Sequence, residues 1–174
     1  MQIRPAKLKD AHEIARVYVR TWRDTYRNIV PDGYLDAMAI PEVERSFLQE
    51  LQDDQTFSFI AQEGGEKGVV GFVTGGFERK RDWIYSGEIY TLYVLKNYQR
   101  RGIGLQLVCA LAEQLNRFDI YAMMVWVLKQ NPYRQFYEKI NGIFLRSQRI
   151  PFAGTALEAI AYGWINTDLI LTPL

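Results

Sequence analysis

The sequence contains very little cysteine or histidine, with one residue of each among 174. A single cysteine excludes an internal disulfide framework, and one cysteine with one histidine cannot build a Cys/His zinc site. A lone thiol is typical of a reducing compartment. The composition therefore indicates neither a small disulfide-bonded scaffold nor a zinc protein.

Long apolar runs and a strong charge of one sign are also missing. Charged residues interrupt every stretch long enough to span a bilayer, and residues 1–14 lack the apolar core of a signal peptide. The 21 Lys and Arg nearly balance the 20 Asp and Glu, so the chain lacks the basic footprint of a nucleic-acid binder. We therefore expect a cytoplasmic protein that binds neither membrane nor nucleic acid.

Apolar residues are abundant: they make up 48% of the chain, and aromatic residues make up 14%. This supply suits a sizeable core and an aromatic-lined pocket. There is no internal repeat and no low-complexity segment, and Gly64, Gly65 and Gly68 are typical of a hairpin turn. We therefore expect a single domain over residues 1–174.

Hydrophobic periodicity predicts helices and strands in a defined order. The expected elements are strand 2–5, helices 11–22 and 41–51, strands 57–61, 69–77 and 83–95, helix 105–115, strand 122–128, a helix opened by Asn131-Pro132, and strands 143–150 and 157–168. Pro31, Asp32 and Gly33 are expected to break the chain between the first two helices. This order predicts a mixed α/β sheet with helices packed on it.

The segment from Gln99 to Leu105 joins an apolar strand to an amphipathic helix and contains Gly102 and Gly104. The first turn of a helix leaves backbone N–H groups without partners, and the helix dipole favours an anion there. Glycine lets a diphosphate approach the backbone closely, and Arg100 and Arg101 add positive charge. These residues predict a phosphate site, and a strand-to-helix turn with solvated arginines is the alternative.

Two common phosphate motifs do not fit this segment. A dinucleotide fingerprint requires a third glycine, at the position of Leu107, and a Walker A loop requires a Gly-Lys-Ser or Gly-Lys-Thr end that is absent. The spacing of these residues alone therefore leaves open the possibility of a phosphate-binding module of another kind.

The run Tyr98-Gln99-Arg100-Arg101-Gly102-Ile103-Gly104 is similar to the acetyl-CoA signature Gln/Arg-x-x-Gly-x-Gly/Ala of the GNAT N-acetyltransferase superfamily. Residues 88–94 resemble that family's fourth strand, and residues 131–139 resemble its segment from strand five to helix four. The opening, Ile3-Arg4-Pro5-Ala6 and then Asp10, is also similar to many members. The sequence departs from the pattern in two places: Tyr133 replaces a common small alanine, and residues 141–143 replace a Leu-Gly-Phe-like ending.

The resemblance implies a mixed, mostly antiparallel central sheet of about seven strands, flanked by about four helices and splayed between strands four and five. It also implies acetyl-CoA as the acyl donor, with the diphosphate on the amides of residues 100–105, the pantetheine arm along strand four, and no metal. The implied donor-binding residues are Leu92, Tyr93, Val94, Gln99, Arg100, Arg101, Gly102, Ile103, Gly104, Leu105 and Asn131.

Tyr137 is the implied general acid, because family members use a tyrosine at this helix position to protonate the departing thiolate. It also lies on the apolar stripe of its helix, so a plain core role is the alternative. Glu88 is the candidate general base, directly or through water, and a solvated strand-end charge is the alternative. The backbone N–H of Tyr93 would stabilise the developing oxyanion.

By resemblance, the acceptor lies between residues 22–37 and 150–156. These segments contain the aromatic residues Trp22, Tyr26, Tyr34 and Phe152 and the carboxylates Asp32 and Asp36. Aromatic rings and carboxylates could receive a cationic amine. Simple packing of the two helices is the alternative role for the rings.

These expectations combine into an N-acetyltransferase that transfers an acetyl group from acetyl-CoA to a primary amine of a small molecule or peptide. The amine would attack directly in a ternary complex, and a longer acyl group stays open. A coenzyme A-binding regulator without transferase activity is the alternative function. Family members often dimerise, so a homodimer is a candidate assembly.

Overall fold

The computed structural model describes residues 1–64 and 68–171, so the turn predicted at Gly64, Gly65 and Gly68 lies partly outside that range. Its framework is a seven-stranded sheet in the order β1-β2-β3-β4-β5-β7-β6. The strands are β1 (Gln2–Pro5), β2 (Thr56–Gln62), β3 (Val69–Phe77), β4 (Gly87–Val94), β5 (Met123–Leu128), β6 (Ile143–Phe152) and β7 (Thr155–Trp164). Neighbours are antiparallel except β4 and β5, which run parallel. The predicted mixed, mostly antiparallel sheet is confirmed.

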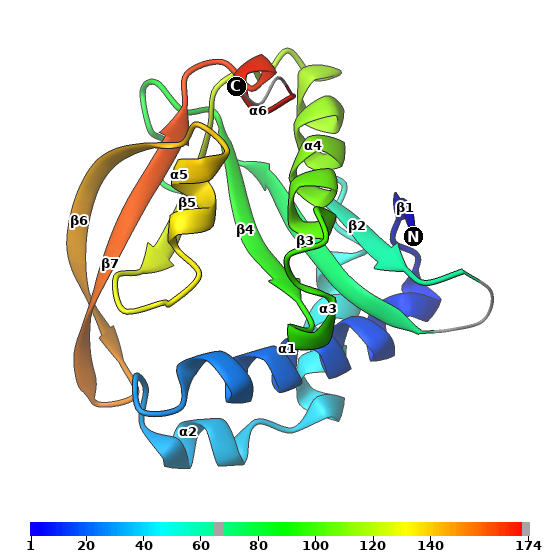
Figure 1. The fold of residues 1–174 in the computed structure, drawn as a ribbon, viewed down its shortest axis with the longest axis vertical. Helices are drawn as coiled ribbons and strands as arrows, with labels where there is room; N and C mark the ends of the chain where they lie inside the picture. The colour runs from blue at the N-terminus through cyan, green and yellow to red at the C-terminus, as the bar shows by residue number, and fades with distance from the viewer. Residues whose placement is uncertain (65–67, 172–174) are drawn as a thin grey trace.

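Helices cover this sheet. They are α1 (Ala11–Tyr26), α2 (Asp32–Ala37), α3 (Ile40–Glu50), α4 (Ile103–Asn116), α5 (Gln135–Lys139) and α6 (Asp168–Leu171), with 3-10 helices η1 (Leu8–Asp10) and η2 (Lys96–Tyr98). In Figure 1, α4 and α5 lie in front of the sheet, and α1 and α2 cross its lower end. No helix within the two described ranges is long and apolar enough to cross a membrane.

The α4 helix packs against the sheet through one apolar face. Leu107, Leu111 and Leu115 are fully buried at a spacing of four residues, which places them on the same side of the helix. Burying each leucine contributes about 2 kcal/mol relative to leaving it exposed. The packing of these leucines fixes the start of α4 against the end of β4.

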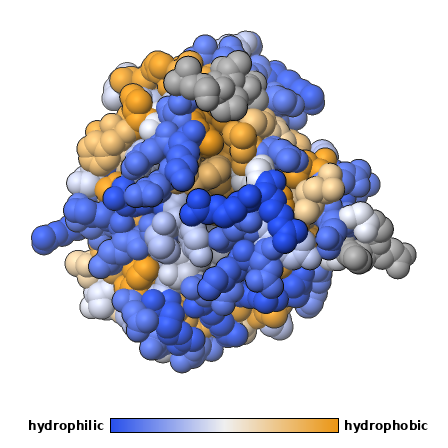
Figure 2. Space-filling model, in the orientation of Figure 1, coloured by the Kyte–Doolittle hydropathy of each residue, from blue (hydrophilic) through white to orange (hydrophobic). Residues whose placement is uncertain are grey.

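Hydrophilic side chains cover most of the molecular surface shown in Figure 2, and apolar side chains gather toward its upper edge.

Three local boundaries differ from the sequence prediction. Residues after Pro31 form α2 rather than a simple break, because Leu35 turns inward and is fully buried. The strand predicted over 83–95 begins at Gly87, because the Asp82 carboxylate accepts backbone hydrogen bonds from Ile84 (2.9 Å) and Tyr85 (3.0 Å) and holds a loop.

The third difference concerns α5, which begins at Gln135 rather than at Pro132. The Asn131 carboxamide oxygen accepts a hydrogen bond from the Tyr133 backbone N–H at 2.8 Å. Asn131 therefore caps a turn that precedes the helix, which is the side-chain-to-backbone pattern that asparagine favours.

The β4 and β5 strands separate after a short parallel pairing. The paired residues are Gly87 with Met123, Glu88 with Met124 and Ile89 with Val125. Just beyond them, the register between β3 and β4 shifts, so that Tyr90 is an extra residue in β4. A bulge of this kind bends a strand and increases its twist. The predicted splay between strands four and five is confirmed.

We expect Gly75→Ala to destabilise the fold by about 1–3 kcal/mol through overpacking, as measured by equilibrium urea unfolding. A Cβ at this position would lie 2.5 Å from the Glu88 carbonyl oxygen and 2.5 Å from Leu111 Cδ2. Gly33→Ala is the control, because a Cβ there meets nothing within 4 Å. It should be neutral or stabilise by up to about 1 kcal/mol. Equal losses in both variants would contradict the close packing of β3 against α4.

Candidate active site

Beyond its pairing with β5, the end of β4 borders a cavity of about 510 Å³, which we call the large cavity. Ten of the eleven residues predicted to bind the acyl donor line it: Leu92, Tyr93, Val94, Gln99, Arg100, Gly102, Ile103, Gly104, Leu105 and Asn131. They come from β4, from the start of α4 and from the turn before α5. Segments far apart in the sequence therefore meet here as the sequence predicted.

The backbone between β4 and α4 forms a cradle for an anion. Arg100 and Gly102 both have left-handed conformations, with φ of 61° and 75°. Such an arrangement turns successive N–H groups toward one point. No group in the described ranges accepts a hydrogen bond from the N–H groups of residues 100–105. These donors and the N-terminal end of α4 can together hold a phosphate group.

The two arginines of this segment differ in position. The Arg101 guanidinium donates to the Asn97 carbonyl at 2.9 Å and lies over the Tyr98 ring, so its side chain does not line the large cavity. Gln99 donates to the Val94 carbonyl at 3.0 Å and ties the turn to the end of β4. Of the two, Arg100 is the arginine that borders the cavity.

A second cavity of about 210 Å³, which we call the small cavity, shares Leu92, Tyr93, Asn131 and Tyr137 with the large one. Its other lining residues are Trp22, Tyr26, Tyr90, Thr91, Val125, Trp126, Val127, Leu128, Ile150, Phe152 and Ala159. Three of the four predicted acceptor residues are among them. The fourth, Tyr34, does not line the small cavity, but its ring meets those of Phe152 and Trp22 at 4.7 and 5.9 Å.

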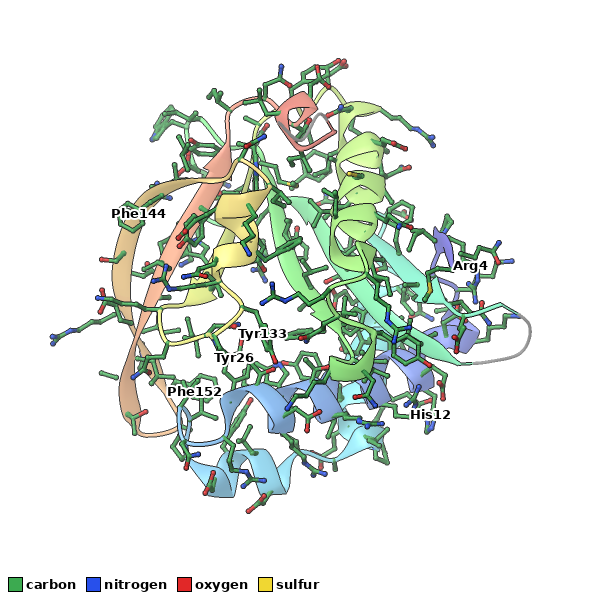
Figure 3. All side chains as sticks on the ribbon, viewed as in Figure 1. Arg4, His12, Tyr26, Tyr133, Phe144 and Phe152 are labelled. Atoms are coloured by element: carbon green, nitrogen blue, oxygen red, sulfur yellow. The ribbon has the colours of Figure 1, made fainter. Side chains whose placement is uncertain are left out.

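Asn131 links the walls of the two cavities. Its oxygen caps the turn at Tyr133, and its nitrogen donates to the Tyr26 hydroxyl at 2.9 Å. Figure 3 places Tyr26, Tyr133 and Phe152 where α1 faces the turn before α5 and the β6–β7 hairpin. One amide group thus holds the end of α1 against the segment that enters α5.

Tyr137 lies between the two cavities. Its side chain is 8% exposed, and its ring packs against Phe136, Tyr162 and Trp164. Burial raises the pKa of its hydroxyl, so the phenol stays protonated at neutral pH. No described residue forms a hydrogen bond with this hydroxyl, so its proton can be donated to a group in either cavity.

Glu88 lines neither cavity. Its buried carboxylate is bound by the Arg79 guanidinium, with Nη2 2.6 Å from Oε1 and Nε 3.0 Å from Oε2. The same guanidinium lies 4.1 Å from the ring centre of Tyr90, which does line the small cavity. The carboxylate of the predicted base is therefore bound by Arg79 and does not reach that cavity directly.

The aspartates of α2 also lie away from the site. Asp32 and Asp36 form ion pairs with Arg27 at 3.2 Å and line neither cavity. Both carboxylates are largely exposed, which makes such pairs weak. The structure does not bring these carboxylates to a bound amine.

Sequence reasoning missed several residues of the large cavity: Thr21, Thr25, Tyr98, Pro132, Tyr133, Gln135, Phe136 and Lys139. The spacing of Thr21 and Thr25 was an available signal, because two threonines four residues apart share one face of α1 with its apolar stripe. The Thr21 hydroxyl is buried and has no hydrogen-bond partner within the described ranges. A polar ligand in the large cavity would satisfy it.

No group of three or more His, Cys, Asp or Glu side chains able to hold a metal ion occurs among residues 1–64 and 68–171. The polar groups that converge here are instead backbone N–H donors, hydroxyls and one carboxamide. The structure thus combines a mixed sheet opened between its parallel strands, free N–H groups at the start of α4 and a tyrosine between two cavities. These are the features that the resemblance to the N-acetyltransferase class implies.

Comparison with known proteins agrees with this class. Residues 13–143 match the profile of the acetyltransferase (GNAT) family. The chain is 35% identical to an uncharacterized N-acetyltransferase, YuaI of Bacillus subtilis (strain 168), over 173 residues, which is 99% of this chain and 97% of that protein. The chain belongs to the GNAT acetyltransferase family.

Solved structures show the same fold at low sequence identity. Ribosomal-protein-alanine N-acetyltransferase from Brucella melitensis superposes with a TM-score of 0.74 at 18% identity, covering 94% of this chain and 99% of that one. The PaiA N-acetyltransferase from Thermoplasma acidophilum, solved in complex with coenzyme A, gives a TM-score of 0.69 at 19% identity. That match covers 91% of this chain and 96% of the other.

We expect Gly104→Val to weaken acetyl-CoA binding by about tenfold or more, measured by isothermal titration calorimetry. A Cβ at this position already lies 3.3 Å from two ring atoms of Phe136, so the valine methyl groups would enter the large cavity. Gln106→Val is the control, because it places the same β-branched residue on an exposed position of α4 outside the lining. Equal affinity in both variants would contradict the position of the anion cradle.

Proposed function

We propose that the protein is an N-acetyltransferase that transfers an acetyl group from acetyl-CoA to a primary amine of a small molecule or peptide. The observation that carries this proposal is the pair of cavities that meet at Leu92, Tyr93, Asn131 and Tyr137. Two substrates can enter from different sides and react where the walls meet. Because all seven strands belong to one sheet, residues 1–174 act in this proposal as a single unit.

In this proposal the large cavity binds the acyl donor. The diphosphate lies on the N–H groups of residues 100–105, and the pantetheine arm runs along residues 92–94. In the described part of the chain, the β4 backbone has no strand partner on its β5 side beyond Ile89, so a ligand amide can hydrogen-bond there like an added strand. The coenzyme A complex of the PaiA enzyme supports the choice of donor.

The reaction follows from the groups at the shared wall. The amine nitrogen attacks the thioester carbonyl, and the backbone N–H of Tyr93 stabilises the negative charge that develops on oxygen. The C–S bond then breaks, and Tyr137 donates its proton to the departing thiolate. The proton lost by the amine passes through water to Glu88, since this carboxylate does not reach the small cavity itself.

Direct attack is favoured over a covalent enzyme intermediate. The single cysteine, Cys109, is half-buried on α4 and lines neither cavity. Burial raises the pKa of its thiol, which lowers the thiolate fraction that a nucleophile needs. The acyl group therefore passes between substrates in a ternary complex.

A coenzyme A-binding regulator would need the large cavity but not the small one, so the small cavity favours the enzyme. The test is the release of free thiol from acetyl-CoA in the presence of amines, with the acetylated amine identified by mass spectrometry. Tight acetyl-CoA binding without any amine-dependent thiol release would support the regulator instead. A cytoplasmic location, favoured by the lone thiol and the balanced charge, belongs to the same proposal.

Tyr137→Phe should lower kcat by roughly 100- to 10,000-fold, the usual contribution of a general acid, and leave acetyl-CoA affinity nearly unchanged. Steady-state kinetics and calorimetry separate these two effects. Tyr162→Phe is the control: its ring stacks on Tyr137 at 5.9 Å, but its hydroxyl bonds to Glu138 and Arg134 outside both cavities. If Tyr137→Phe keeps wild-type turnover, Tyr137 is not the general acid and has only a structural role.

For Glu88→Gln we expect a loss of kcat/KM that shrinks as pH rises. Each rise of one pH unit below the pKa of the amine gives about ten times more free amine, which needs no base before it attacks. A pH–rate profile of both enzymes measures this dependence. A constant fractional loss at every pH would show instead that Glu88 acts by holding Arg79 and the start of β4.

A further inference from the structure

Among residues 1–64 and 68–171, those that line the small cavity include no charged side chain. Its lining includes seven aromatic residues, among them Trp22, Tyr90, Trp126 and Phe152, and apolar residues from β5, β6 and β7. Its side-chain polar groups are Thr91, Asn131 and the hydroxyl and indole groups of the rings. A cavity of this composition favours an apolar or aromatic guest.

A cation would be poorly accommodated in this cavity. Burying an ammonium group without a carboxylate partner carries a large desolvation cost, so an amine is bound here in its neutral form. Aromatic faces can also attract cations, but protein cations already occupy two of them. Arg79 lies 4.1 Å from the ring centre of Tyr90, and Lys80 and Arg146 lie 5.2 and 5.5 Å from that of Trp126. Arg79 and Arg146 are themselves paired with Glu88 and Asp82, so these ring faces are occupied and these two carboxylates are already bound. A polyamine would therefore find neither a free ring face on Tyr90 or Trp126 nor a free carboxylate in these two ion pairs.

The size of the cavity limits the guest to a small molecule. An engineered apolar cavity of about 150 Å³ is large enough for benzene. The small cavity, at about 210 Å³, has room for one ring and a short linker. At one end, the Phe152 ring meets Trp22 at 5.9 Å and Tyr34 at 4.7 Å, so the tip of the β6–β7 hairpin packs onto α1 and α2.

We propose that the acceptor is a small arylalkylamine without a second cationic group, whose ring fills the small cavity and whose amine reaches the wall shared with the large cavity. This inference rests on the proposed function, because it specifies the acceptor of the same site. The linker carries the amine past Tyr93 toward Tyr137, where the two cavities meet.

Initial rates of thiol release from acetyl-CoA test the proposal on four amines, each compared as kcat/KM per free amine. The amines are 2-phenylethylamine, propylamine, spermidine and the dipeptide phenylalanylglycine. We expect 2-phenylethylamine to exceed propylamine roughly 100-fold, as burial of a phenyl ring implies, and to exceed spermidine further. Equal or higher values for propylamine or spermidine would overturn the inference while leaving the transferase intact.

The remaining outcomes are also decisive. A preference for the dipeptide would overturn the small-molecule acceptor in favour of a peptide. If no amine releases thiol although acetyl-CoA binds, the proposed function fails together with this inference. The acceptor class and the transferase activity are therefore tested separately.

A variant that fills the cavity supplies a second test. Ala159 is 3% exposed and lines the small cavity but not the large one. Ala159→Leu should lower kcat/KM for 2-phenylethylamine at least about tenfold, leave acetyl-CoA affinity unchanged and affect methylamine little. Ala156→Leu, on an exposed position of the same strand, is the matched control.

A binding measurement does not depend on the stability of any variant. With the wild-type protein, 2-phenylethanol should compete with 2-phenylethylamine, because it carries the same ring and linker without a charge. Propanol at the same concentration should not compete. Equal inhibition by both alcohols, or none by either, would contradict a ring-binding cavity.

Discussion

The separation of β4 from β5 is the constraint on which the rest of the structure depends. These strands pair over only three residues each, and the extra residue Tyr90 then turns β4 away. A strand edge left inside a protein has N–H and C=O groups that need partners, and leaving them buried without partners is costly. Such an edge is stable only where water or a ligand can pair with its free N–H and C=O groups. The large cavity lies beside this part of β4 and gives room for both.

Buried tyrosine rings and ion pairs occupy different places around the gap between β4 and β5. The rings of Tyr93 and Tyr137 lie at the junction of the cavities, and burial raises the pKa of both hydroxyls. The ion pairs of Glu88 with Arg79 and of Asp82 with Arg146 lie outside both linings. Because these ion pairs lie outside both cavities, backbone dipoles at the wall that the cavities share would act in a medium of lower dielectric constant, where they are more effective.

The sequence predicted the order of helices and strands along the chain well, because that order depends on local signals. Residues 99–105 encode a turn and a helix start, and the buried strand over 123–128 is a continuous apolar run. The partner of Glu88 and the composition of the small cavity depend instead on tertiary contacts. Val125, Ile150 and Ala159 read as ordinary core residues in the sequence, and only the splay of the sheet turns them into a wall. Likewise, no local pattern showed that Asp32 and Asp36 would face Arg27.

The wall shared by the two cavities also limits which substitutions can change one cavity without changing the other. Leu92, Tyr93, Asn131 and Tyr137 each face both cavities. A substitution that makes room for a longer acyl chain at this wall also reshapes the space for the amine. Under the proposed function, specificity for the acyl group and specificity for the amine are thus linked in evolution and in engineering. By contrast, Ile150, Phe152 and Ala159 line only the small cavity. Under the proposed function, substitutions at these three positions would change the acceptor and leave the donor cavity as it is.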